Sequence, residues 1–113
     1  MTTPLSALAD VITERRRQIE AENWAPAHDD EHTDGQLAMA AACYAVAAAW
    51  QADGSEPRPT RETTGMPEWP WDEEWWKPKD ARRNLVRAAA LLLAEIERVD
   101  RASQLQNRDD HGG

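Results

Sequence analysis

Three stretches of the chain carry apolar residues at helical spacing, and no stretch alternates apolar and polar residues as a strand does. The first runs from Pro4 to about Glu22, the second covers residues 35–51, and the third covers residues 80–103. We therefore predict an all-α fold with three main helices. Residues 1–103 are expected to form a single helical domain, followed by a flexible tail over residues 104–113.

The apolar positions define a surface on each predicted helix. The first helix carries Leu5, Leu8, Ile12 and Ile19. The third carries Leu85, Ala88, Ala89, Leu92, Ile96 and Val99. The second is mostly alanine, at Ala38, Ala41, Ala42, Ala45 and Ala48. Alanine favours helix and lets a neighbouring helix approach closely, and we expect Cys43 and Tyr44 of the second helix to lie in the core.

Two polar segments join these helices. The shorter, residues 23–34, contains Trp24 and the run His28-Asp29-Asp30-Glu31-His32. The longer, residues 52–79, contains five of the seven prolines. It also contains Trp69, Trp71, Trp75 and Trp76. Four tryptophans so close together argue against disorder, and we expect a short helical turn over residues 72–76, capped by Asp72.

Composition narrows the class of protein. The 113 residues include 13 Lys and Arg against 21 Asp and Glu, giving a formal net charge of −8. This charge disfavours binding to duplex nucleic acid or to an anionic membrane. No apolar run reaches the length of a membrane span, and the first residues do not follow a signal-peptide pattern. The single Cys43 fits a reducing compartment, so we expect a cytoplasmic protein.

The aromatic content is unusual, with six Trp, one Tyr and no Phe. Tryptophan suits sites with one apolar and one polar side. One interpretation is a stacking wall for a flat ring such as a nucleobase, worth on the order of 1–3 kcal/mol per base, with Lys77 and Lys79 binding its phosphates. The other is a lid that closes a core poor in large aliphatic residues. Both interpretations are open at this point, and each can hold for different tryptophans.

Basic residues gather where the third helix begins, at Lys77, Lys79, Arg82 and Arg83. The positive end of the helix dipole disfavours cations there, so an anionic ligand would explain them. Contacts with tryptophan rings or with Glu73 and Glu74 are the alternative. On the first helix, Arg16 lies near the apolar stripe and either extends to solvent or enters a polar pocket, whereas Arg15 and Arg17 are expected to be solvated.

The acidic and histidine run at residues 28–32 admits three interpretations: polar contacts to a ligand, a structural turn, or a metal site. A metal site is disfavoured because the chain has no second His or Cys cluster. We expect no metal, no cofactor and no catalytic residue. The candidate ligand-binding residues are Arg16, Trp24, His28, Asp29, Asp30, His32, Trp69, Trp71, Trp75, Trp76, Lys77, Lys79 and Arg83.

The chain resembles a family of short phage and prophage proteins over nearly its whole length outside residues 52–66 and the two ends. The resembling segments are Glu14–Glu20, Asn23-Trp24, His28–Asp30, Gly35–Ala38, Ala41–Ala45, Trp69–Trp71, Trp75–Lys79, Leu85-Val86 and Ala94–Arg98. Members generally carry no assigned activity. For this chain, the resemblance implies a protein of the host cytoplasm if it is phage-encoded.

A looser similarity is to the RyR repeat domain, a small, mostly helical module. The place of its Gly-Trp is taken by Trp24, and that of its acidic turn by Asp29 and Asp30. The Pro70-Trp71 pair takes the place of its Pro-aromatic element. What this similarity implies is binding of a nucleotide-like ligand.

Together these features favour a protein that sequesters a nucleotide-like immune signalling molecule without catalysis, an anti-defence sponge. A cyclic dinucleotide or an ADP-ribose derivative would be the ligand. One alternative is a protein-binding inhibitor of a host factor. Another is an all-α nucleotide pyrophosphohydrolase of the MazG-like kind, although the chain has Glu97-x-x-Asp100 and no Glu-x-x-Glu. A thin three-helix core also favours a homo-oligomer.

Overall fold

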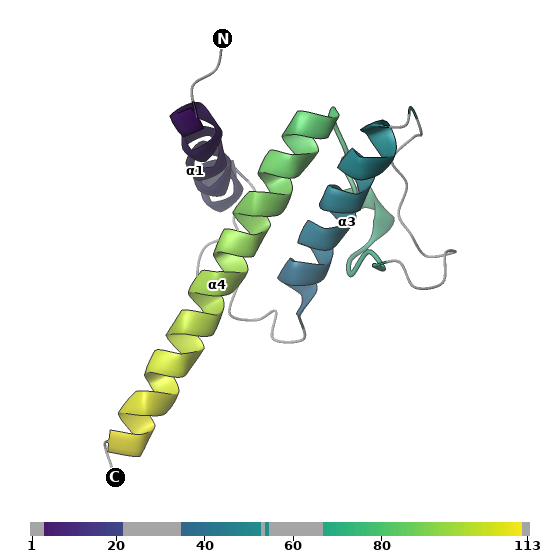
Figure 1. Cartoon of the computed structure of the whole chain (residues 1–113). Coiled ribbons are helices and arrows are strands. Elements are labelled where there is room, and N and C mark those ends of the chain that lie inside the picture. Colours follow the sequence, from purple (N-terminus) through teal and green to yellow (C-terminus); the bar gives the residue numbers. More distant parts are fainter. Residues whose placement is uncertain (1–3, 22–34, 53, 55–66, 112–113) are drawn as a thin grey trace.

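The computed structural model describes residues 4–21, 35–52, 54 and 67–111. Its elements are α1 (Pro4–Ala21), α3 (Gln36–Ala52), the 3-10 turn η1 (Glu73–Trp75) and α4 (Ala81–His111). The prediction of an all-α fold is confirmed. The long helix α4 lies between α1 and α3 and packs against both (Figure 1).

The main core lies between α3 and α4, where small side chains allow the two helices to pack closely. The buried residues of α3 are Leu37, Ala40, Ala41, Cys43, Tyr44, Ala47 and Ala48. The prediction that Cys43 and Tyr44 belong to the core is confirmed. From α4, Ala88, Leu91 and Ala94 join the same cluster, and Trp69 covers it from the segment that precedes η1.

Local sequence explains the ends of the helices. Gly54, in the left-handed region with φ of 82°, donates its N–H to the Gln51 carbonyl at 3.0 Å, so α3 ends near the predicted place. Asp80 caps α4 by accepting the Arg83 N–H at 3.0 Å. Asp72 precedes η1 as predicted, but its side chain makes no capping hydrogen bond, so that part of the prediction is wrong. Helix α4 continues to His111, beyond the predicted end at Ser103.

The apolar stripes lie on unexpected sides of α1 and α4. Amphipathic spacing normally marks the packed side of a helix, yet Leu5, Leu8 and Ile12 are exposed. The exposed apolar residues of α4 include Leu85, Leu92, Ile96 and Val99. The side of α1 that packs on α4 is instead polar, because its charged residues are paired there. The buried residues of α1 are Glu14, Arg15 and Gln18.

None of the described helices combines the length and the hydropathy that crossing a membrane requires.

Candidate functional site: a charged cluster under the tryptophan segment

Glu14 is the centre of a buried polar cluster between α1 and α4, with its side chain 2% exposed. Arg17, one turn further along α1, donates two hydrogen bonds to it, from Nε to Oε1 at 2.8 Å and from Nη2 to Oε2 at 2.7 Å. The Gln18 amide donates a third at 3.3 Å. From α4, Arg83 Nη2 and Arg87 Nε lie 3.8 and 4.0 Å from the carboxylate. One carboxylate therefore faces three guanidinium groups.

The electrostatics of this cluster favour the ionised form of Glu14. Burial by itself raises the pKa of the carboxyl, because the charged form loses hydration. The hydrogen bonds and charge of Arg17, the charge of Arg87 and the Gln18 hydrogen bond act in the opposite direction. They outweigh burial, and the pKa of Glu14 lies below its ordinary value of 4.5.

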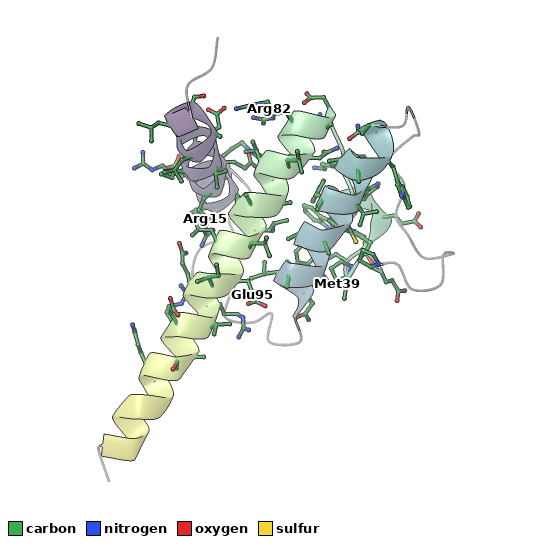
Figure 2. The ribbon with its side chains drawn as sticks, viewed as in Figure 1. Arg15, Met39, Arg82 and Glu95 are labelled. Atoms are coloured by element: carbon green, nitrogen blue, oxygen red, sulfur yellow. The ribbon has the colours of Figure 1, made fainter. Side chains whose placement is uncertain are left out.

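Two further ion pairs hold α1 on α4. Arg15 donates to Glu97 at 3.1 Å, and Arg82 lies 2.7 Å from Asp10. Figure 2 shows Arg15 of α1 and Arg82 of α4 between these two helices. The expectation that Arg15 is solvated is wrong: its side chain is 6% exposed, because Glu97 pairs with it across the interface. Arg17 likewise turns toward Glu14 rather than to solvent.

Above the cluster, a segment rich in tryptophan closes the core. The ring of Trp69 meets that of Tyr44 edge to face, with centroids 5.6 Å apart, and its Nε1–H donates to the Asp72 carbonyl at 3.0 Å. Trp76 stacks on Tyr44 at 4.8 Å, and Trp71 meets Trp69 edge to face at 5.4 Å. These three tryptophans form the lid predicted by the structural interpretation.

Trp75 differs from the other three. Its side chain is 48% exposed, and the Lys77 ammonium lies 5.5 Å from the centre of its ring. It is therefore the tryptophan of this segment that can offer an open ring face to a ligand.

Arg87 links the charged cluster to this segment. Its Nη1 donates to the Lys77 carbonyl, and its guanidinium carbon lies 5.7 Å from the centre of the Tyr44 ring. The Tyr44 hydroxyl in turn accepts the Lys77 N–H at 3.3 Å. The backbone at Lys77 is thus fixed by one residue of α3 and one of α4. Sequence reasoning missed Arg87, because a lone arginine within an apolar helical pattern gives no signal of burial.

The start of α4 is fixed by a second polar network around the buried Asn84. Its Oδ1 accepts the Lys79 N–H at 2.8 Å, and its amide donates to the Lys79 carbonyl at 3.0 Å and to Gln51 Oε1 at 2.8 Å. Gln51 also donates to the Lys79 carbonyl at 2.6 Å. These bonds join the end of α3 to the start of α4 and hold the backbone of Lys79, whose side chain remains exposed.

A small hollow opens between the cluster and the tryptophan segment. It is lined by Glu14, Arg17, Gln18, Tyr44, Trp75, Lys77, Arg87 and Leu91. Its volume of about 20 Å³ is room for about one water molecule. Three of the lining side chains are cationic and one is anionic. Within the described part of the chain, Arg87 Nε and Gln18 Oε1 are buried and have no hydrogen-bond partner.

The structure gathers only some of the residues predicted to bind a ligand. Trp75 and Lys77 line the hollow, and Arg83 approaches Glu14 from its edge. Arg16 is exposed and does not join the cluster, while Lys79 points to solvent at the start of α4. Trp69 is buried, and Trp71 and Trp76 pack against the core. Trp24, His28, Asp29, Asp30 and His32 lie outside the described residues.

Among the residues that the structure describes, no group of three or more His, Cys, Asp or Glu is placed to hold a metal ion. Glu97, half of the acidic pair considered for a pyrophosphohydrolase, accepts a hydrogen bond from Arg15. Comparison of the chain with protein-family models, with curated proteins and with solved structures finds no match.

The lowered pKa of Glu14 makes the stability of the fold depend on pH. The unfolded carboxyl titrates near 4.5 and the folded one below it, so the unfolded chain binds more protons in between. The contribution of Glu14 is therefore complete above pH 4.5 and is lost as the pH falls through the folded pKa. We expect the urea midpoint to fall on acidification below about pH 4.5. A midpoint unchanged from pH 6 to pH 3 would contradict this assignment.

Proposed function

We propose that this chain binds a small anion that carries a flat ring, of the nucleotide class, and that it does so without catalysis. The observation that carries the proposal is the composition of the hollow, which Arg17, Lys77 and Arg87 line together with one carboxylate, beside the half-exposed Trp75. Cations with an exposed aromatic face are the combination that binds phosphate and base together.

The small volume of the hollow restricts how such a ligand sits. A space for one water molecule admits a single phosphate or carboxylate oxygen, so the ring must lie outside it, against Trp75. The buried Nε of Arg87 is a donor available to that oxygen. Lys77 is exposed, so its ammonium can reach the rest of the anion. The segment over residues 22–34, which carries the other candidate ligand residues, follows α1 directly in the chain.

Sequestration fits this site better than turnover. Holding a ligand needs only affinity, and the hollow contains cations and one paired carboxylate rather than a nucleophile beside a base. The resemblance to phage proteins suggests an immune signalling nucleotide, either a cyclic dinucleotide or an ADP-ribose derivative. The protein would then act as an anti-defence sponge in the host cytoplasm.

The direct test is binding to a panel of cyclic dinucleotides, ADP-ribose derivatives and mononucleotides, measured by tryptophan fluorescence and equilibrium dialysis. We expect Trp75→Leu and Lys77→Gln each to weaken binding about tenfold, because stacking and charge-assisted contacts are each worth on the order of 1–3 kcal/mol. Lys79→Gln is the matched control, since this lysine lies two residues away and does not line the hollow.

The fate of the bound molecule separates a sponge from an enzyme. Denaturing the complex and analysing the supernatant by chromatography should return the ligand intact. A chemically altered ligand would show catalysis and contradict the proposal. Failure of every panel member to bind at millimolar concentration would contradict the binding function itself.

A further inference from the structure

Helix α4 presents an apolar face that neither α1 nor α3 covers. Leu85, Leu92, Ile96 and Val99 are each between 47 and 57% exposed. Their spacings of seven, four and three residues place them on one line along the helix, and the half-buried Ala89 continues it. The buried residues of α4, such as Leu91 and Ala94, lie on the other side. We call the line Leu85, Ala89, Leu92, Ile96 and Val99 the α4 seam.

The spacing of the α4 seam is that of a coiled coil. Residues 85, 92 and 99 repeat every seven positions, and 89 and 96 repeat between them, which is the pattern of two helices that pack along their length. A globular helix packs through a wider stripe, so a narrow seam opposite the packed side indicates a helix as the partner. Within the described residues, α1 and α3 pack on other sides of α4 and leave the α4 seam uncovered.

We propose that a second copy of this chain covers the α4 seam, with the two α4 helices antiparallel. In the register that fits best, Leu85 faces the second copy's Ile96 and Ala89 faces the second copy's Leu92. A two-fold axis passes between residues 90 and 91, and the same contacts recur on its other side. The layer next to the axis thus packs a small residue against a large one, and the outer layer packs two large aliphatic residues together.

The charges beside the seam select this orientation. In the antiparallel register, the exposed Arg82 of one copy lies beside the exposed Asp100 of the other, at both ends of the interface. In a parallel pair, Glu95 of one copy would lie beside Asp100 of the other, and the two like charges would repel. Antiparallel packing also opposes the two helix dipoles favourably.

Sedimentation equilibrium on the full chain tests the association. We expect a mass of twice the 12.7 kDa of one chain at micromolar concentration. The double variant Leu92→Glu with Ile96→Glu should sediment as a monomer with unchanged helical circular dichroism, because both side chains are exposed in one copy. Leu105→Glu is the matched control: this exposed leucine lies on α4 but off the seam, so the variant should remain dimeric.

Cysteine cross-linking tests the orientation. In a Cys43→Ala background, Leu85→Cys and Ile96→Cys proteins are mixed in equal amounts and oxidised. Antiparallel packing brings position 85 of one copy to position 96 of the other, so the mixture should give the mixed disulfide in at least tenfold excess over either protein linked to itself. Preferential self-linking would overturn the antiparallel register. A monomer up to 100 µM, or a dimer that persists in the double Glu variant, would overturn the proposal.

Discussion

Replacement of Trp69 by Ala is expected to lower the free energy of unfolding by about 4 kcal/mol, the cost typical of removing a fully buried tryptophan. The ring is 2% exposed and contacts Tyr44, Trp71 and Trp76. Its N–H bond to the Asp72 carbonyl also holds the turn that leads into η1. Because α3 contributes mainly alanines to this core, most of its side chains are too short to fill the space. Urea denaturation followed by far-ultraviolet circular dichroism measures the loss.

Trp75→Ala is the control for that prediction. Trp75 is half exposed, so we expect a loss below about 1 kcal/mol, together with about tenfold weaker binding of the proposed ligand. The two variants thus distinguish a lid from a stacking surface within one short segment. Equal losses of stability in both variants would show that the segment packs differently from the described arrangement.

The different positions of these tryptophans show what the sequence can predict and what it cannot. Their density alone predicted an ordered segment, and the choice between a lid and a stacking wall stayed open. The structure gives Trp69, Trp71 and Trp76 contacts with the core and leaves Trp75 half exposed. Which ring turns inward depends on the backbone path through η1 and on anchors such as Tyr44 and Arg87, which lie far away in sequence.

The apolar stripes show a second limit. Their spacing predicted the helices well, because helical periodicity depends only on local sequence. It did not predict which surface each stripe covers. The polar side of α1 packs on α4 because the charges of Glu14 and Arg15 find partners on α4, and such pairing between distant elements leaves no periodic signal. The stripe that contains Leu85 and Ile96 is then left exposed.

The candidate site and the fold share the same residues. Arg87 fixes the Lys77 backbone, approaches Glu14 and lines the hollow, so the proposed ligand binding would be coupled through one side chain to the attachment of α1. An anion that engages Arg87 would bind the folded chain in preference to the unfolded chain. It would therefore stabilise the folded chain by mass action. Thermal stabilisation by a ligand is therefore expected to be lost in variants of the hollow and retained in variants of the α4 seam.

Glu14→Gln is expected to lower the free energy of unfolding by about 3 kcal/mol, the scale for removing one partner of a buried ion pair. The substitution keeps the shape of the side chain but leaves Arg87 buried without its counter-charge, and it replaces an acceptor of the Arg17 hydrogen bonds with a donor. Urea denaturation at pH 7 measures this loss. Glu20→Gln on the exposed side of α1 is the control and should change stability by less than about 0.5 kcal/mol.

The pH dependence of the same variant identifies the cause. If the charge of Glu14 stabilises the fold, the variant loses the part of the acid dependence below pH 4.5 that this carboxyl supplies, and the stabilities of wild type and variant converge at low pH. Added phosphate should stabilise the variant more than the wild type, because the arginines around the hollow then lack the Glu14 carboxylate that faces them. A variant as stable as the wild type at pH 7 would show that the cluster contributes no net stability and that α1 is held by its other contacts.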